Sequence, residues 1–240
     1  MQCLILAGGL GTRIASVAPT IPKTLIPVAG APFAQHQLTL LARSGIDRVV
    51  YAIAHRGAQV EEFVGDGSRW GLEVAYVHDG EKLLGTGGAV RAALDAGVLE
   101  DSFFVLYGDS YLPIDYRSVQ GAFQKSGSRA LMTVFRNAGQ WDTSNVLYEE
   151  GRVLLYDKRR ADPRSSAMVH IDYGLSVLTS DVVAERLPPA QPFDLADLFH
   201  TLSVGGELAG YEVTTRFYEV GSPAGLKDLE ALLSTRPSGA

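Results

Sequence analysis

Short apolar segments alternate with amphipathic segments along the first two-thirds of the chain. The apolar segments are typical of β-strands, which we expect at residues 2–7, 48–54, 72–77, 102–107 and 130–136. The segments between them carry apolar residues at helical spacing, which predicts helices at residues 32–44, 58–64, 89–96 and 116–126. This β-then-α order favours an α/β fold, a three-layer αβα sandwich whose doubly wound mixed sheet is mostly parallel.

The pattern changes after residue 136. Residues 145–148 and 152–156 flank an acidic turn that ends in Gly151, as expected for a β-hairpin. Further segments predict strands at residues 168–178 and 208–213, and helices at residues 180–186, 195–202 and 223–233. No linker-like segment separates the two regions, so we interpret residues 1–240 as one domain with a loose tail over residues 234–240.

The composition is that of an ordinary globular protein, with 46% of the 240 residues hydrophobic and 20% charged. The net charge is −6, without the basic stripe typical of nucleic-acid-binding proteins, so we expect no nucleic-acid partner. Cys3 is the only cysteine, which excludes an internal disulfide. The apolar run at residues 4–7 is too short for a membrane span or a signal peptide, so we expect a cytoplasmic protein without a membrane partner.

The N-terminal segment carries the strongest chemical signal. Residues 6–13 run Leu6, Ala7, Gly8, Gly9, Leu10, Gly11, Thr12 and Arg13. Lys23 follows later, directly after Pro22. Glycines allow a tight turn whose backbone N–H groups can surround an anion. Arg13 and Lys23 add a forked and a compact cation, both suited to phosphate oxygens. The segment predicts phosphate binding, although a glycine-rich turn after a first strand also occurs for packing reasons alone.

Asp109 is a candidate metal ligand. It follows the predicted strand 102–107, which is apolar throughout, as expected for a strand buried on both faces. The carboxyl end of such a strand faces the ligand crevice of an α/β sheet. Mg²⁺ in proteins binds one or two carboxylates together with phosphate oxygens. The alternative is that Asp109 caps a turn.

The whole N-terminal string, with Pro22-Lys23 and residues 27–32, resembles the N-terminal motif of the sugar-1-phosphate nucleotidylyltransferases, which have a Rossmann-like fold. These enzymes join a nucleoside triphosphate to a sugar 1-phosphate and release pyrophosphate. The resemblance implies that Arg13 holds the leaving pyrophosphate and that Lys23 draws the reacting phosphates together, with Asp109 as the third catalytic residue. It also implies a set of nucleotide-binding residues, namely Leu6, Ala7, Gly8, Gly9, Gly11, Thr12 and Arg13.

The segment over residues 216–223 is similar to the late motif of the family, in which an aspartate precedes a small residue, a glycine and Ser or Thr. Glu219 takes the place of that aspartate, which implies that Glu219 and Asp109 hold Mg²⁺ together. The longer side chain changes the distance to the metal. The alternative is that Glu219 is a solvated residue before a helix that Ser222 caps and Pro223 begins.

The segment over residues 81–89 is similar to the part of the family that lines the nucleoside pocket. The resemblance implies that Glu81, Gly85 and Thr86, together with Gly108, bind the nucleotide, and that backbone groups read the edge of the base. Its form is most similar to that of the guanylyl- and uridylyl-transferring branches. The alternative is a plain helix N-terminus with Thr86 as its cap.

Three later segments correspond to acceptor-binding positions of the family. Asp157-Lys158 resembles its Glu-Lys-Pro element, which implies that Lys158 contacts the sugar phosphate and Asp157 the sugar hydroxyls. Asp172 and Gly174 stand where relatives often show Asn-x-Gly, and Asn145 stands where they commonly show glycine, which implies further sugar contacts. These departures from the family pattern indicate an unusual acceptor.

The residues after Lys158 leave an alternative open. Arg159 stands where the family motif has proline, and Arg160 follows it. A run of basic residues usually forms a solvated edge. On that interpretation Asp157 and Lys158 belong to the protein surface and not to a substrate site.

The resemblance assigns residues 1–136 mainly to nucleotide binding and residues 137–233 mainly to the sugar phosphate. The expected partners are a nucleoside triphosphate and a sugar 1-phosphate, with GTP and a heptose or hexose 1-phosphate first, as in the guanylyltransferases that act on heptose 1-phosphate for cell-surface glycans. There are three alternatives. They are a uridylyltransferase for an N-acetylated sugar phosphate, a cytidylyltransferase for phosphocholine or another non-sugar phosphate, and a non-catalytic nucleotide-sugar-binding regulatory protein. Family members include monomers and homo-oligomers, so the resemblance leaves the oligomeric state open.

Overall fold

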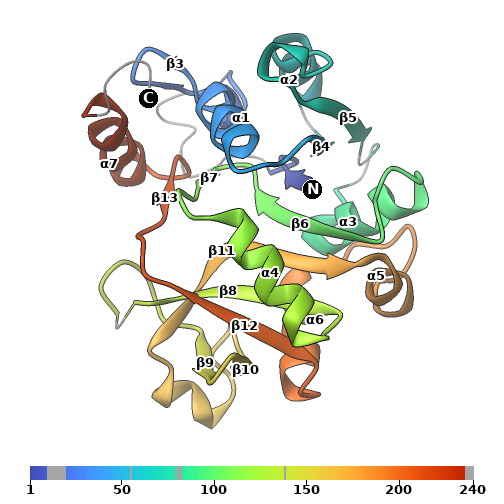
Figure 1. The fold of residues 1–240 in the computed structure, drawn as a ribbon, viewed down its shortest axis with the longest axis vertical. Coiled ribbons are helices and arrows are strands. Elements are labelled where there is room, and N and C mark those ends of the chain that lie inside the picture. The colour runs from blue at the N-terminus through green and yellow to red at the C-terminus, as the bar shows by residue number, and fades with distance from the viewer. Residues whose placement is uncertain (10–19, 55, 79, 81–82, 138, 236–240) are drawn as a thin grey trace.

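A mixed sheet of nine strands runs through the part of the chain that the computed structural model describes, which is residues 1–9, 20–54, 56–78, 80, 83–137 and 139–235. Its strand order is β5-β4-β1-β6-β11-β8-β12-β10-β9 (Figure 1). In chain order these strands are β1 (Gln2–Leu6), β4 (Arg48–Ile53), β5 (Glu73–His78), β6 (Ser102–Tyr107), β8 (Ala130–Arg136), β9 (Val146–Glu149), β10 (Arg152–Tyr156), β11 (His170–Thr179) and β12 (Leu208–Val213).

Only β10 and β11 run against the direction of the other strands of this described sheet. β5, β4, β1 and β6 are parallel to their neighbours, and β12 is parallel to β8. β11 lies between β6 and β8 and is antiparallel to both, and β10 is antiparallel to β12 and β9. The predicted mixed and mostly parallel sheet is therefore confirmed, and the sheet contains strands from both halves of the chain.

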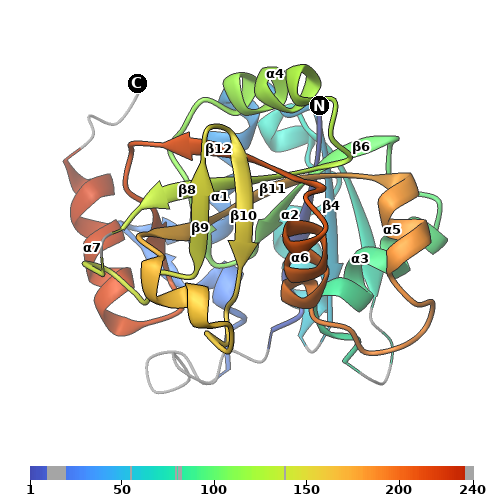
Figure 2. The same ribbon diagram turned by 90° about the horizontal axis from the view of Figure 1, so that it is seen from below.

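Helices cover both faces of the sheet. α1 (Phe33–Arg43), α2 (Gly57–Val64) and α4 (Tyr116–Ser126) pack into one hydrophobic core, and α3 (Gly85–Asp95), α5 (Ser180–Arg186) and α6 (Leu195–Val204) pack into the other. Figure 2 shows α4 and α6 on opposite sides of β8, β11 and β12, with the β9–β10 hairpin crossing in front of these strands at a steep angle. The three predicted layers are present. None of the described helices is long and apolar enough to cross a membrane.

The continuous apolar sequence of β6 follows from its place between the two helical layers. Phe103 and Val105 are buried in the core beneath α3, α5 and α6, whereas Phe104 and Leu106 are buried in the core beneath α1, α2 and α4. Successive side chains of a strand point to opposite faces, so a strand covered on both sides needs an apolar residue at every position. Asp109 is the first charged residue after this apolar strand, and it lies where the chain leaves the core at the carboxyl end of β6.

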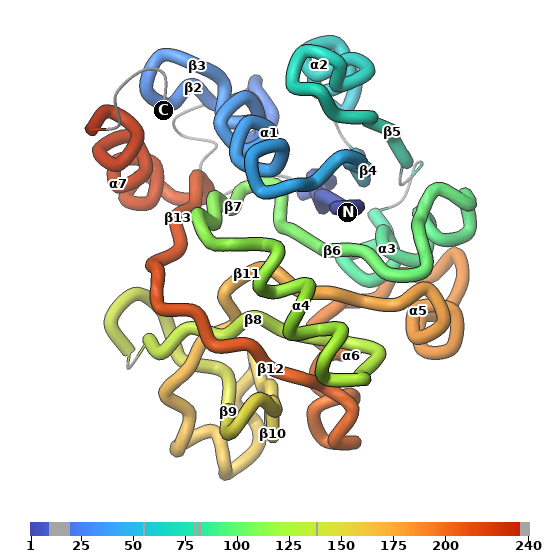
Figure 3. The backbone as a smooth tube through the Cα atoms, viewed as in Figure 1, coloured from blue at the N-terminus to red at the C-terminus, as the bar shows by residue number. Residues whose placement is uncertain are grey.

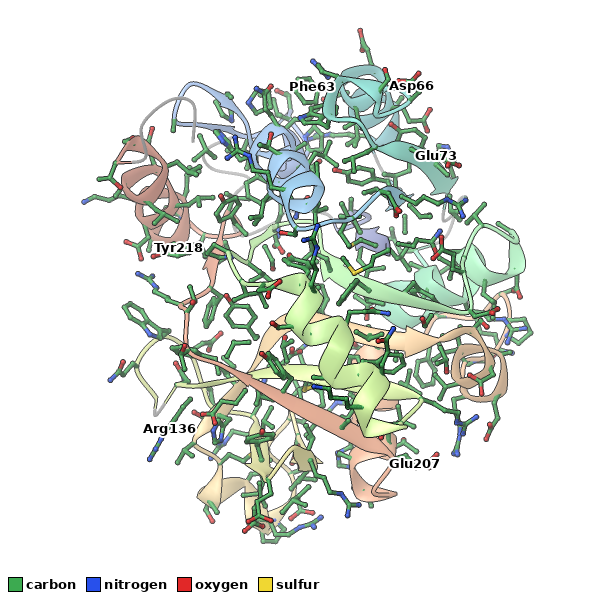
Figure 4. The ribbon with its side chains drawn as sticks, in the orientation of Figure 1. Phe63, Asp66, Glu73, Arg136, Glu207 and Tyr218 are labelled. Carbon is green, nitrogen blue, oxygen red and sulfur yellow. The ribbon has the colours of Figure 1, made fainter. Side chains whose placement is uncertain are left out.

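A third, smaller core joins the C-terminal helix to the segment around residues 28–33 (Figure 3). It contains residues of α7 (Pro223–Ser234), of the short hairpin β2 (Pro27–Val28) and β3 (Ala31–Pro32), and of the pair β7 (Ser110–Tyr111) and β13 (Tyr218–Glu219). Tyr218, labelled in Figure 4, lies on β13 beside α7, far from Arg136 and Glu207 at the two ends of the β8–β12 part of the sheet. The sequence did not predict these strands, because two residues show no periodicity.

Other boundaries differ from the predictions by a few residues. α3 begins at Gly85 and not at residue 89, so the glycine-rich segment forms the first turn of this helix. Three 3₁₀ helices, at Lys23–Leu25, Ser68–Trp70 and Pro163–Ala167, were not expected. α7 includes Ser234, one residue beyond its predicted end, and residues 236–240 of the predicted tail lie outside the described residues.

Two glycines of α4 allow a matched test of the helix. An added Cβ would have nothing within 4 Å at either Gly121 or Gly127. The two differ in backbone conformation, because Gly121 lies in the helix interior and Gly127 ends the helix with φ +63°. We expect Gly121→Ala to raise the free energy of unfolding by about 0.5–1 kcal/mol, and Gly127→Ala to lower it by about 1 kcal/mol because alanine resists positive φ. Urea unfolding of both variants measures the two effects, and equal signs would contradict this assignment of α4 and its end.

Candidate functional site

A cavity of about 250 Å³ opens at the carboxyl ends of β1 and β6. It brings together most of the residues predicted to bind the nucleotide and two predicted catalytic residues. The lining residues are Leu6, Ala7, Gly8, Gly9, Lys23, Thr24, Leu83, Gly85, Thr86, Ala89, Tyr107, Gly108 and Asp109. The predicted residues Gly11, Thr12, Arg13 and Glu81 lie outside the described part of the chain.

Gly108 allows the ends of β1 and β6 to approach each other closely. Its N–H donates a hydrogen bond to the carbonyl oxygen of Leu6 at 3.0 Å. A Cβ at residue 108 would stand 2.9 Å from that oxygen and 3.0 Å from the Cα of Ala7, closer than real side chains tolerate. A glycine is therefore required here, and the chain turns at once to present Asp109 at the edge of the cavity.

Lys23, Asp109 and Glu219 converge on the backbone of Gly221. The Nζ of Lys23 lies 2.9 Å from Oδ2 of Asp109 and forms an ion pair with it. A Cβ on Gly221 would stand 2.9 Å from Oδ2 of Asp109, 2.7 Å from Oε2 of Glu219 and 3.4 Å from Nζ of Lys23. The three charged groups therefore surround one point that only a glycine leaves open.

The pairing of β7 with β13 brings Glu219 to Asp109. Glu219 lies opposite Ser110 in this pair, and the N–H of Val220 donates to the carbonyl oxygen of Asp109 at 2.9 Å. The Glu219 carboxylate also accepts hydrogen bonds from the N–H of Gly221 and the hydroxyl of Ser222, the N-cap residue of α7. Glu219 is thus held at the N-terminus of α7, where a negative charge is stabilised.

Asp109 and Glu219 have the donor chemistry of a magnesium site. Among the described residues no group of three or more His, Cys, Asp or Glu side chains is placed to hold a metal ion. Mg²⁺ needs fewer protein ligands, because it keeps waters and binds substrate phosphates beside one or two carboxylates. Asp109 and Glu219, whose carboxylate oxygens approach each other beside Gly221, supply that number of protein ligands.

Gln37 supports the turn that carries Asp109, and sequence reasoning missed it. Its buried side chain on α1 donates hydrogen bonds from Nε2 to the carbonyl oxygens of Ser110, at 2.8 Å, and Tyr107, at 3.3 Å. It stands four residues after Phe33 and four before Leu41, both of which are buried. A polar residue on the apolar face of a predicted helix was the available signal.

The glycine-rich segment at the start of α3 packs against the chain before α6. The N–H groups of Gly87 and Gly88 both donate to the carbonyl oxygen of Phe193, and a Cβ on Gly85 would stand 2.7 Å from that oxygen. These N–H groups are therefore occupied within the protein, whereas the resemblance implied that backbone groups of this segment read the edge of the base. Thr86 does not cap α3 either, because its hydroxyl bonds to Asp194 and Leu195.

The residues predicted to bind the sugar phosphate begin with Asp157 and Lys158, next to the chain before α6. Lys158 is exposed, and its Nζ lies 3.9 Å from Oδ2 of Asp194. Asp157 is buried, and its carboxylate accepts hydrogen bonds from the N–H groups of Arg159 and Asp162 and from the hydroxyl of Ser165. Burial opposes ionisation of Asp157, but these hydrogen bonds hold its pKa below the ordinary value. Asp157 thus shapes the loop that follows Lys158.

The two basic residues after Lys158 differ in their contacts. Arg159 is exposed and pairs with Asp197 at 2.8 Å. The guanidinium of Arg160 donates to the carbonyl oxygens of Ser144 and Ser165. Arg159 therefore has the surface role expected of a charge run, whereas Arg160 ties two loops together.

Asp172, Gly174 and Asn145 form a connected group where β11 meets β9. The N–H of Asp172 donates to Oδ1 of Asn145, and the N–H of Gly174 donates to Oδ1 of Asp172, both at 2.9 Å. Gly174 has φ +100°, at an irregularity in the pairing of β11 with β8. The pKa of Asp172 is raised to about 6, chiefly because the carboxyl is buried. The Gly174 hydrogen bond and the charge of Lys158 lower this pKa but offset the effect of burial only in part.

Comparisons with known proteins support the family resemblance that the sequence motifs indicated. The family model described as "Nucleotidyl transferase" matches residues 2–144. The chain is 35% identical over 182 residues to D-glycero-alpha-D-manno-heptose 1-phosphate guanylyltransferase of Campylobacter jejuni, covering 76% of this chain and 77% of that protein. It is 28% identical over 231 residues to UTP–glucose-1-phosphate uridylyltransferase of Synechocystis, covering 90% of this chain but only 58% of that protein. The chain thus spans about three-fifths of the length of that longer relative.

Solved structures share the fold. The structure of HddC from Yersinia pseudotuberculosis matches with a TM-score of 0.77 at 20% identity, covering 97% of this chain and 99% of that one. The inositol-1-phosphate CTP transferase from T. maritima matches with a TM-score of 0.81 at 22% identity, covering 100% and 97%. The predicted fold and the predicted family resemblance are both confirmed.

The pKa of Asp172 is raised and that of Asp157 is lowered, so the two residues should affect the pH dependence of stability in opposite directions. The native state binds the Asp172 proton more tightly than the unfolded chain, so the wild type loses stability as the pH rises from about 4 to about 6. We expect Asp172→Asn to raise the free energy of unfolding at pH 8 by about 1–2 kcal/mol, allowing for solvent at this carboxyl, and to lose that advantage towards pH 4.

Asp157→Asn is the matched control, and its effect should have the opposite sign. The pKa of Asp157 is lowered, so its carboxylate stabilises the fold above the ordinary value of 3.8, and this stabilisation disappears as the pH falls through the lowered pKa. Urea unfolding of both variants from pH 8 down to below the ordinary value of 3.8 measures the two effects. A loss of stability in Asp172→Asn at pH 8 would contradict the environment described for that residue.

Proposed function

The chain belongs to the nucleotidyl transferase family, and we propose that it transfers a nucleotidyl group from a nucleoside triphosphate to a sugar 1-phosphate and releases pyrophosphate. The observation that carries this proposal is the convergence of Lys23, Asp109 and Glu219 at the edge of a glycine-lined cavity. A cation and two metal-binding carboxylates beside bare backbone suit a reaction between two phosphate groups.

The proposed reaction needs no general base. An oxygen of the sugar 1-phosphate attacks the α-phosphorus of the triphosphate, and the bond from that phosphorus to the pyrophosphate oxygen breaks. A phosphate monoester is already ionised near neutral pH, so catalysis rests on positioning and on neutralising charge. Lys23 can serve both needs, because its ammonium lies at the cavity wall and draws two anionic groups together.

Asp109 and Glu219 are the proposed Mg²⁺ ligands. A bound divalent cation would offset the charge that develops on the phosphate oxygens. The predicted roles of Gly11, Thr12 and Arg13 in holding the triphosphate remain part of this proposal on the strength of the motif alone. Leu6, Ala7, Gly8 and Gly9, which precede them in the sequence, line the cavity.

Lys158 is the proposed ligand of the acceptor phosphate. Its ammonium is exposed and makes no contact shorter than 3.9 Å with a described acidic group, so it can bind an incoming anion. Asp172, Asn145 and Gly174 would contact the sugar, whereas the hydrogen bonds of Asp157 suit it better for holding the loop behind Lys158. Of the two arginines after Lys158, only Arg159 has the surface role expected of a solvated basic edge.

GTP with a heptose or hexose 1-phosphate is the proposed substrate pair. The support is the similarity, at 35% identity over most of both chains, to a protein named as a heptose 1-phosphate guanylyltransferase. A non-catalytic binding protein of the same fold would have no need of the Lys23–Asp109 ion pair beside a second carboxylate. An assay of pyrophosphate release with Mg²⁺, four nucleoside triphosphates and several hexose and heptose 1-phosphates tests the proposal. Release with none of the pairs would contradict it.

Lys23→Ala and Asp109→Asn test the site directly. Each removes one charge from the point where the phosphates would meet, and we expect kcat to fall by about 10²–10³. Lys125→Ala, which removes an exposed lysine from α4, is the control and should leave kcat unchanged. Steady-state pyrophosphate release measures all three, and near-normal turnover in Lys23→Ala would rule out its assigned role.

A further inference from the structure

Asp194, the residue before α6, contacts both parts of the proposed site. One oxygen, Oδ1, accepts hydrogen bonds from the hydroxyl of Thr86 and from the N–H of Ala196, each at 3.0 Å. The other oxygen, Oδ2, lies 3.9 Å from Nζ of Lys158. Thr86 lines the nucleotide cavity, and Lys158 is the proposed ligand of the acceptor phosphate. No other described carboxylate makes these two contacts.

The contact with Thr86 fixes the glycine-rich segment of the nucleotide cavity. The Thr86 hydroxyl donates to Asp194 and accepts from the N–H of Leu195 at 2.8 Å, so both of its hydrogen-bonding functions are used. Beside it, Gly87 and Gly88 donate to the carbonyl oxygen of Phe193. The start of α3 therefore depends for its position on residues 193–195.

The contact with Lys158 is electrostatic and leaves the ammonium free to bind. A distance of 3.9 Å is too long for a hydrogen bond but short enough to attract an exposed, flexible side chain. Burial alone would raise the pKa of Asp194, but the Ala196 N–H, the Lys158 ammonium and the Thr86 hydroxyl together lower it. Asp194 therefore stays ionised at neutral pH, and its charge is available to orient Lys158.

We infer that Asp194 is a positioning residue that holds the nucleotide-binding segment through Thr86 and directs Lys158 towards the acceptor phosphate. This inference rests on the proposed function. Asp194 touches no reacting atom, so its effect passes through two other residues. One side chain at the start of α6 thereby links the nucleotide-binding segment to the proposed ligand of the acceptor phosphate.

The competing explanation is that Asp194 is only the N-cap of α6, and Asp194→Asn separates the two. Asparagine caps helices as well as aspartate does, and its Oδ1 can keep the bonds to Ala196 and Thr86, but the charge facing Lys158 is lost. Exposed ion pairs of this kind change equilibria by about twofold to fivefold. We therefore expect the KM for the acceptor to rise by about twofold to fivefold, with kcat and the KM for the nucleotide unchanged.

Two further variants make the kinetic test decisive. In a Lys158→Met background Asp194→Asn should have no further effect on the acceptor KM, because its target is gone. Asp197→Asn is the matched control, since Asp197 also lies on α6 and pairs with an arginine at 2.8 Å without touching Thr86 or Lys158. Asp194→Asn without effect, or with an equal effect in both backgrounds, would overturn the link to Lys158.

Thr86→Val tests the other contact, and its first readout, hydrogen exchange, needs no substrate. Loss of the hydroxyl should speed hydrogen exchange at the Gly87 and Gly88 amides, and raise the nucleotide KM by about threefold to tenfold, whereas Asp194→Asn should leave this exchange unchanged. Exchange at wild-type rates in Thr86→Val would overturn the link to α3. A wild-type protein that turns over no substrate pair contradicts the proposed function instead, and hydrogen exchange still decides the role of Thr86.

Discussion

The ion pair between Lys23 and Asp109 is the contact on which the proposed site depends. Asp109 and Glu219 both lie within 2.9 Å of the point where a Cβ of Gly221 would stand, so two negative charges share a small volume. Like charges this close repel each other unless a cation lies beside them. The Lys23 ammonium, 2.9 Å from Asp109, supplies that charge, and the N-terminus of α7 supplies donors for Glu219. The same electrostatic need explains why the site suits a divalent cation and phosphate groups.

The fold brings these three residues together from distant parts of the chain. Asp109 lies at the end of β6, Lys23 begins the 3₁₀ helix Lys23–Leu25, and Glu219 belongs to β13, which pairs with β7 directly after Asp109. The small core around α7 and the β2–β3 hairpin holds that pair in place. A close crossing at Gly108 and the buried amide of Gln37 then fix the turn that carries Asp109. Packing beside the sheet, more than the sheet itself, therefore sets the geometry of the site.

The sequence predicted the layers of the fold well and the contacts of the site only in part. Strands such as β6 are recognisable because burial on both faces requires an unbroken apolar run. Gly8, Gly9 and Lys23 were recognisable as candidates because the glycines and cations of this segment stand close together in sequence, and all three line the cavity. The two-residue strands β7 and β13 left no periodic signal. The crowding of Gly85 against Phe193 and the contact of Thr86 with Asp194 join segments about a hundred residues apart, so only the folded chain reveals them. The same holds for the contact of Lys158 with Asp194, which lies on a different segment of the chain.

The central claim is that Asp109 and Glu219 form one cation site at the edge of the nucleotide cavity. A crystal of the protein grown with Mn²⁺ and a non-hydrolysable nucleoside triphosphate analogue, measured at the manganese absorption edge, locates the ion directly. We expect an anomalous peak within bonding distance of a carboxylate oxygen of each residue and of a phosphate oxygen. A manganese peak remote from Asp109, or a triphosphate bound away from the cavity at the ends of β1 and β6, would contradict that claim.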